Sequence, residues 1–295
     1  MDGVLLIDKP SGPTSHDVVA RMRRALQVRR IGHTGTLDPL ASGLLPLVIG
    51  RATRLASLLT GSDKTYEATI RLGYGTDTDD AQGSPTGPAA DTLPSDSEIE
   101  AVLENFRGTF EQVPPSHSAK KIGGARAYEL ARDRQPVVLA PVKVTVRALE
   151  WLGRAGETVD IRVQATAGFY VRGLARDIGA RLGCGAHITA LRRIGSGWFE
   201  IGDAMPLVEA ERLGLGVADR LLSPAAALPA VPAVTMTPTG LERSLHGQAV
   251  EAAHLTDAFV ARDTESLVRL LAADGRLVAL ARQRGDALHP VVVLG

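Results

Sequence analysis

Residues 32–47 read GHTGTLDPLASGLLPL and contain one carboxylate, Asp38, between Leu37 and Pro39. The rest of the stretch is small, apolar or turn-forming, and its one imidazole is His33. A carboxylate with so little around it to replace water is predicted to be buried with a cationic partner, to act as a nucleophile or base, or both. Thr-Leu-Asp-Pro is also common turn chemistry, so a plain turn role stays open.

The segments around this stretch predict runs of strands and of helices. Alternating apolar residues predict strands over 3–8, 64–73, 142–151 and 158–166, with 153–157 joining the last two as a hairpin. Helical spacing predicts a helix over 13–28 capped by Thr14 or Ser15, one near 97–106 with a Ser97–Glu100 capping box, and one from Phe169 onward. Without a regular β-α alternation, this order predicts an α+β fold whose mixed, largely antiparallel sheet is flanked by helices.

Chain length and composition predict two domains. Residues 1–222 are predicted to form the larger one, which carries a basic insertion at 114–140. Residues 223–238 contain four prolines and predict a seam. Residues 239–295 are predicted to form a small β-rich module with a turn at Asp274-Gly275.

Charge and cysteine content narrow the functional classes. The net charge is +0, yet residues 76–111 hold nine acids and one base, whereas residues 116–195 hold fourteen Lys and Arg against six acids. Such asymmetry favours an anionic ligand on one face, although two solvated surfaces explain it equally well. The single cysteine, Cys184, excludes an internal disulfide. With no leader and no apolar run near ~18 residues, we predict a cytoplasmic protein without membrane contact.

Six motifs, in order, resemble a known family. They are Lys9-Pro10-Ser11-Gly12 with Thr14-Ser15, GHTGTLDPLASGLLPL, KTYEA (64–68), PPSHSAKKIGGARAYELAR (114–132), FYVRGLARDIG (169–179) and LGCGAHITALRR (182–193). This set is similar to the bacterial family of tRNA pseudouridine synthase B, which isomerises the T-loop uridine at conventional position 55 of tRNA. The resemblance covers roughly residues 1–205 and implies the pseudouridine synthase fold. The tail resembles the family's small PUA-like module more loosely.

The resemblance implies roles for particular residues. Asp38 matches the catalytic nucleophile, Arg172 the arginine that pairs with it, and Tyr66 the tyrosine that stacks on the target uracil. Tyr170 and Leu191 match the lining of the base pocket, and His33 matches a histidine that contacts the RNA where the base has left its stack. Lys9 and Pro10 match a motif that supports the active-site loops. We therefore expect Asp38 and Arg172 to meet in the folded chain.

The same resemblance implies tRNA, gripped by its T-arm, as the partner. The candidates for phosphate contact are Lys120, Lys121, Arg126, Arg132, Arg192 and Arg193. The isomerisation adds and removes no atom, so neither a metal nor an organic cofactor is expected, and no obligate protein partner is indicated. The family commonly has an aromatic residue at His117 and an apolar one at Lys120, so the contacts of this loop are expected to differ.

Two other readings compete with the isomerase. One is a non-catalytic RNA-binding or tRNA-folding protein on the same fold, which would have no need of Asp38, Tyr66 and Arg172 together. The other is a guide-dependent synthase like the archaeal and eukaryotic relatives, which the missing basic extensions disfavour. A calcium loop at Asp77, Asp79 and Asp80 is dismissed, because Gln82 stands where that motif needs glycine.

Overall fold

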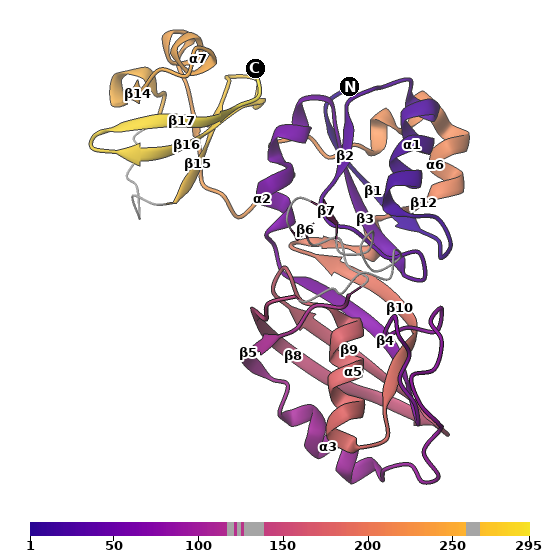
Figure 1. Cartoon of the computed structure of the whole chain (residues 1–295). Helices are drawn as coiled ribbons and strands as arrows, with labels where there is room; N and C mark the ends of the chain where they lie inside the picture. The colour runs from indigo at the N-terminus through magenta and orange to yellow at the C-terminus, as the bar shows by residue number, and fades with distance from the viewer. Residues whose placement is uncertain (117–120, 123–124, 127–138, 258–265) are drawn as a thin grey trace.

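The computed structural model describes residues 1–116, 121–122, 125–126, 139–257 and 266–295. A large mixed sheet runs through the body of the molecule, and a smaller β-rich domain lies beside its N-terminal half (Figure 1). Helices pack along the large sheet, so the predicted α+β class with a separate C-terminal β domain is confirmed. None of the helices in the described ranges combines the length and the apolar run that a membrane crossing requires.

Ten strands of the described chain form the large sheet in the order β12-β1-β3-β10-β4-β9-β8-β5, with β2 on β3 and β11 on β10. Only the pairs β1/β12 and β3/β10 are parallel. The strands are β1 (Gly3–Lys9), β2 (Ile31–His33), β3 (Ser42–Ile49), β4 (Lys64–Leu72), β5 (Gly108–Gln112), β8 (Val142–Ala155), β9 (Thr158–Ala165), β10 (Ala186–Ser196), β11 (Phe199–Glu200) and β12 (Met205–Pro206).

The join between β3 and β10 is narrow. It consists of two residue pairs, Arg192 with Ser42 and Arg193 with Gly43. Gly43 has a φ of +101°, and a Cβ there would lie 2.3 Å from the carbonyl oxygen of Arg193. Glycine is therefore required for the two backbones to approach each other at this point. The join divides the sheet into a part built on β1 and β3 and a part built on β4, β8 and β9.

The helices begin and end where local chemistry permits. In α1 (Ser15–Leu26), Thr14 is the N-cap and forms a capping box with Asp17, as one of the two predicted caps requires. In α3 (Asp96–Glu104) the box is Ser95 with Glu98, so the predicted Ser97–Glu100 box is wrong by two residues. The others are α2 (Ala56–Thr60), α5 (Val171–Leu182), α6 (Leu207–Leu213), η1 (Gly50–Leu55), η2 (Ile201–Asp203) and η3 (Gly214–Arg220).

The predicted hairpin is present but longer than expected. Strand β8 continues to Ala155, so most of the predicted 153–157 connection is strand and the turn is centred on Gly156, whose φ is +60°. Two short strands, β6 (Lys121–Ile122) and β7 (Ala125–Arg126), pair with each other inside the predicted insertion. Of this insertion, residues 117–120, 123–124 and 127–138 lie outside the described residues.

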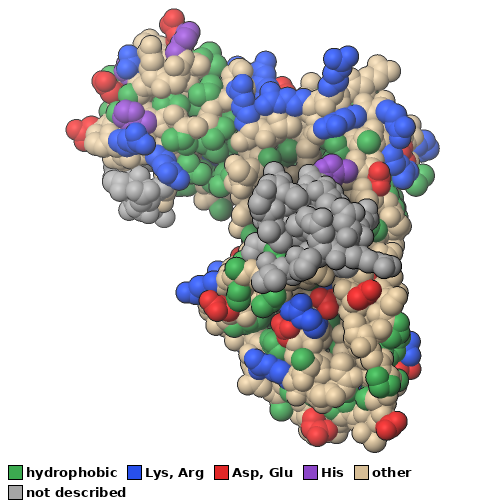
Figure 2. Space-filling model, viewed as in Figure 1, with side chains coloured by type: hydrophobic (Ala, Val, Ile, Leu, Met, Phe, Trp, Pro, Cys, Tyr) green, Lys and Arg blue, Asp and Glu red, His purple; other side chains and the backbone are tan. Residues whose placement is uncertain are grey.

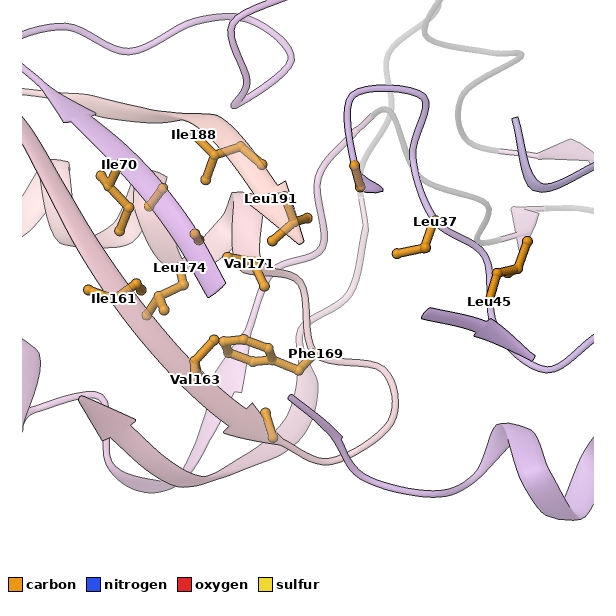
Figure 3. Packing of buried hydrophobic residues seen from close by; sticks show 14 of the residues in the cluster. Leu37, Leu45, Ile70, Ile161, Val163, Phe169, Val171, Leu174, Ile188 and Leu191 are labelled. Atoms are coloured by element: carbon orange, nitrogen blue, oxygen red, sulfur yellow. The ribbon is translucent and has the colours of Figure 1, made fainter. Parts of the chain in front are cut away.

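The main core lies between α5 and the sheet, and it reaches the loop that carries Asp38. Figure 3 shows Val171 and Leu174 packed with side chains such as Ile70, Ile161 and Ile188. Leu37 belongs to the same buried cluster and is 3 % exposed. Because a fully buried leucine contributes roughly 1.5–3 kcal/mol, it fixes the backbone next to Asp38.

The C-terminal domain is a five-stranded sheet in the order β13-β15-β16-β17-β14. Its strands are β13 (Ala233–Thr235), β14 (Val250–Glu251), β15 (Leu267–Leu271), β16 (Leu277–Arg284) and β17 (Ala287–Val293), and it also holds α7 (Pro238–Leu245) and η4 (Ala252–His254). The predicted turn at Asp274-Gly275 lies between β15 and β16. Leu277, Leu280 and Leu294 of this domain share a buried cluster with Leu44 and Val48 of β3. The domain is thus packed on the back of the strand that follows Asp38.

Candidate functional site

The loop that carries Asp38 connects β2 to β3 and is tied down on both sides of the carboxylate. The Ser15 hydroxyl accepts from the Leu37 amide at 2.8 Å and donates to the Leu37 carbonyl at 3.1 Å. The Lys9 ammonium donates to the Ala41 carbonyl at 2.7 Å. The Pro39 carbonyl accepts from the amide of Gly12. These bonds hold the backbone while the Asp38 side chain stays 36 % exposed.

Asp38 and Arg172 are brought together, as the sequence led us to expect. The Arg172 Nε donates to Asp38 Oδ2 at 2.8 Å. The arginine is 4 % exposed, so the buried member of the pair is the guanidinium and not the carboxylate. Arg172 lies in the first turn of α5, whose apolar stripe packs on the sheet and sets its direction. The geometry orients and partly neutralises a carboxylate that still faces open space.

A loop after β4 holds Arg172 from the other side. Its Nη1 donates to the Thr78 carbonyl at 2.9 Å and lies 3.8 Å from an oxygen of Asp80. One turn along α5, Arg176 pairs with Asp79 at 3.2 Å. Burial raises the pKa of Asp79 to about 6. The three aspartates dismissed as a calcium loop therefore include two that contact the arginines of α5.

A cavity of about 300 Å³ opens in front of the ion pair. Asp38 and Arg172 line it together with Tyr66, Tyr170 and Leu191, so five of the residues predicted for catalysis and base binding meet at one place. Tyr66 comes from β4 and Leu191 from β10, on neighbouring strands. The volume is at the small end of the range for ligand sites and suits one ring better than a large molecule.

Tyr170 is fixed by a residue that the sequence did not single out. Gln112, at the end of β5 and fully buried, accepts from the Tyr170 amide at 2.9 Å and donates to the Tyr170 carbonyl at 3.0 Å. These reciprocal bonds hold the backbone immediately before α5, and so the start of the helix that carries Arg172. Sequence reasoning had no signal for Gln112, because the contact joins residues that are 58 positions apart.

His33 lies near this cavity but not in its lining. The Gly35 amide donates to its Nδ1 at 3.3 Å, and the His16 ring stands edge-on with a centroid distance of 5.4 Å. Burial, with His16 and Arg193 nearby, lowers the pKa of His33 to about 4. Near neutral pH the ring is therefore uncharged, which suits stacking or hydrogen bonding better than phosphate pairing.

The predicted phosphate contacts divide into three groups. Arg192 makes a two-pronged pair with Asp8, at 2.7 and 3.1 Å. Arg193 is 1 % exposed and lines the cavity, so its predicted surface contact with phosphate is wrong. Lys120 and Arg132 lie outside the described residues, and of Lys121 and Arg126 only the strand backbone is described.

An exposed basic groove of about 550 Å³, absent from the prediction, runs beside β2. Arg23, Arg29 and Arg30 line it, and Arg30 donates to the Thr53 hydroxyl at 2.6 Å. Figure 2 shows Lys and Arg side chains gathered in this upper area, where Figure 1 places α1, β2 and α2. The run RMRRALQVRR (21–30) held the signal. We call residues 23, 29 and 30 the arginine groove.

Among the described residues, no three His, Cys, Asp or Glu side chains gather closely enough to hold a metal ion. Cys184 is buried, and its thiol donates to the Gly185 carbonyl. Asp38, Arg172 and Tyr66 bring a carboxylate, a guanidinium and an aromatic ring to the cavity. They fit nucleophilic attack on a flat ligand received by stacking.

Two protein-family models together match residues 23–218. The model described as TruB family pseudouridylate synthase (N terminal domain) matches residues 23–171, and the tRNA pseudouridylate synthase B C-terminal domain matches residues 172–218. The chain is 41 % identical over 297 residues to tRNA pseudouridine synthase B of Solibacter usitatus (strain Ellin6076), covering 100 % of both chains. It is 45 % identical over 251 residues to that of Dechloromonas aromatica (strain RCB), covering 85 % of this chain and 84 % of the relative.

Solved structures show the same architecture. A chain of a Cbf5-Nop10-Gar1 complex superposes with a TM-score of 0.76 at 27 % identity, covering 99 % of this chain and 85 % of that one. A chain of an H/ACA RNP bound to a substrate RNA containing 2′-deoxyuridine gives 0.75 at 26 %, with the same coverage. The agreement extends through the C-terminal domain, because nearly the whole chain is covered.

Proposed function

The chain belongs to the TruB family of pseudouridylate synthases, which are isomerases, and from this premise we propose that it converts uridine 55 in the T-loop of tRNA into pseudouridine. Support comes from the tRNA synthase names of relatives that match over their full length. Asp38 is the proposed nucleophile, Arg172 its partner and Tyr66 the ring that receives the flipped base. An enzyme with this substrate works where tRNA is found, so the cytoplasm is its proposed location.

The observation that carries this proposal is the ion pair at the mouth of the cavity. Asp38 is held at 2.8 Å by a buried Arg172 and has one face open to the 300 Å³ space. The isomerisation breaks the bond from uracil N1 to ribose C1′ and forms one from C5, so a rigid carboxylate that can reach C1′ or C6 meets its main need. No atom enters or leaves, and the proposed reaction needs no cofactor.

Tyr66, Tyr170 and Leu191 are proposed to bind the target base. The uridine must leave its stack, which costs a few kcal/mol and is offset by contact with flat or apolar side chains. Tyr66 and Leu191 lie on adjacent strands of the cavity floor, and Gln112 fixes Tyr170 at the wall. These three side chains therefore line a site of about the size of one ring, and the backbone that carries them is held in place.

The tRNA backbone is proposed to dock on the arginine groove and on the basic insertion at 114–140. The groove residues are exposed, and they lie on the elements that lead into the Asp38 loop. His33 follows Ile31 and Gly32 on β2, two residues that also line the groove, and its neutral ring is proposed to contact the RNA between the docking surface and the cavity. Phosphate contacts position RNA without reading its sequence, which suits recognition by shape.

The test is a reaction of the purified protein with an unmodified tRNA transcript, followed by mapping of pseudouridine. We expect one product in the T-loop and none when uridine 55 is replaced by cytidine. Modification at another site would overturn the position, and binding without any product would favour the non-catalytic RNA-binding reading. The matched control is the Asp38→Asn protein, which keeps the size of the side chain and removes its charge.

A further inference from the structure

Three buried cations surround the Asp38 loop without a carboxylate of their own. Lys9 is 0 %, Lys64 6 % and Arg193 1 % exposed. In the described part of the chain none of them forms an ion pair, and the side-chain hydrogen bonds that they donate there go to backbone carbonyls. Burying a cation without an anion costs free energy. Carbonyl oxygens offset only part of this cost, so the burial of three cations at this place calls for a functional explanation.

Two of the three cations face the cavity. Arg193 pairs with Tyr66 across β10 and β4, and Lys64 precedes Tyr66 by two residues on the same strand. Opposed residues, and residues two apart, share one face of a sheet, which puts both cations beside the tyrosine. Both line the cavity, whereas Lys9 does not. The surface proposed to receive the uracil is thus flanked by positive charge.

Before the reaction, the cavity lining holds more positive than negative charge. Arg172 is matched by Asp38, which leaves Lys64 and Arg193 with no anion in the lining. The carboxylate of Asp63, the residue just before β4, acts on Lys64 but already pairs with Arg147 at 3.2 Å. Uracil bound in the cavity is neutral, so the two cations gain little from the bound substrate. They gain most from a state in which the ring is negative.

We propose that Lys64 and Arg193 form a cationic floor that stabilises the negative charge developed on the uracil ring during isomerisation. This inference rests on the proposed function. In attack at C1′, the bond from Asp38 oxygen to C1′ forms while the C1′–N1 pair departs with the ring, which becomes an anion. C5 then bonds to C1′ and returns the carboxylate, one proton leaves C5, and another adds to N1.

The alternative route leads to the same requirement. If Asp38 attacks C6, the C5=C6 pair moves toward O4 and the ring becomes an enolate. Either way the negative charge of the Asp38 carboxylate moves onto the ring, which then lies beside two fixed cations, so the floor stabilises the transition state more than the substrate. Burial, together with Arg193, lowers the pKa of Lys64 to about 8, which still leaves most of the side chain charged near neutral pH.

The experiment compares tRNA with uridine or 5-fluorouridine at position 55 in single turnover, following loss of the original nucleoside. Fluorine withdraws electrons and stabilises the ring anion, so the fluorinated base depends less on the protein's charge. Lys64→Gln keeps a hydrogen-bond donor and removes the charge. We expect the uridine rate to fall about 10²–10³-fold, with tRNA affinity nearly unchanged, as for loss of an oxyanion-hole donor. With 5-fluorouridine the defect should shrink by roughly tenfold or more.

Lys9→Gln is the matched control, because Lys9 is equally buried and bonded to carbonyls but lies outside the cavity lining. Its defect, caused by a loosened loop, should be the same for both bases. Lys64→Arg, which restores the charge, should recover most of the rate. Equal defects for both bases in Lys64→Gln, or a loss confined to tRNA affinity, would overturn the cationic floor. If the wild-type protein converts neither RNA, the proposed function fails instead.

Discussion

The cations of the cavity and those of the arginine groove are chemically alike but differ in their surroundings. Arg23, Arg29 and Arg30 are exposed, whereas Lys64 and Arg193 are buried beside the proposed reaction centre. Salt screens exposed charges over about 10 Å at 0.1 M, while buried charges are screened far less. The groove is therefore suited to docking that weakens with salt, and the cavity to stabilising charge during chemistry. Burial, more than residue type, separates the two roles.

Asp38→Asn should produce the largest effect and confine it to the cavity. The substitution keeps the shape of the loop and removes the nucleophile, so pseudouridine formation should fall by about 10⁴-fold or more. Filter binding should show unchanged tRNA affinity, because Asp38 lies away from the arginine groove. A variant that loses binding as much as activity would show that the two regions are not separate.

Arg172→Met should have the next largest effect. It removes the donor to Asp38 and to the Thr78 carbonyl, and a misplaced nucleophile should slow single turnover by about 10²–10³-fold. Arg176→Met is the matched control, since Arg176 binds Asp79 and the Val113 carbonyl but not Asp38. Equal losses in the two variants would mean that α5 as a whole is disturbed and that the ion pair has no special role.

The alkaline side of the pH–rate profile should test the cavity cations. Because the pKa of Lys64 is lowered to about 8, its ammonium is lost as the pH rises through that value. The rate should then fall roughly tenfold by pH 9, and Lys64→Arg should move this fall to higher pH. The charge of Arg193 lowers the pKa of Lys64, and that of Asp63 raises it. Burial also lowers the pKa of Lys9 to about 8, so Lys9 would lose its charge over the same pH range. Lys9→Arg is therefore the control: if it alone moves the fall, Lys64 is not the titrating group.

Arg29→Ala should have the smallest effect and act on docking alone. Loss of one phosphate contact should weaken tRNA binding several-fold and reduce the slope of log affinity against log salt by about 0.9. Arg71→Ala is the control, because Arg71 is partly exposed but pairs with Glu157 outside the groove. Measured across salt concentrations, an unchanged slope in Arg29→Ala would remove the groove from the docking surface.

Much of the site could be predicted, and the failures have physical causes. The meeting of Asp38 with Arg172 was expected from the resemblance of their motifs, and the apolar stripe of 171–182 predicted the helix that carries the arginine. Residues 186–196 were not predicted to form a strand. On a strand neighbours point to opposite faces, so Arg192 reaches Asp8 while Arg193 enters the cavity. Missing the strand meant misplacing Arg193.

Lys64 shows the opposite case, in which the signal was present. The alternation that put Tyr66, Ala68 and Ile70 on one face of the strand includes Lys64 by the same parity. The grip of the 78–80 loop on Arg172 had no such signal, because it joins residues 94 positions apart without a repeating pattern. Periodicity reports the face of an element, whereas contacts between loops depend on the complete fold.

The narrow join between β3 and β10 limits how this sequence can vary. Gly43 does not itself line the cavity, yet any side chain there would overlap the backbone of Arg193, which does. Two residue pairs join the two parts of the sheet in the described chain, and Asp38 and Leu191 stand on opposite sides of that join. Glycine is therefore required at position 43 by backbone packing and not by substrate binding. In a saturation screen for activity, this glycine should tolerate replacement as poorly as the nucleophile itself.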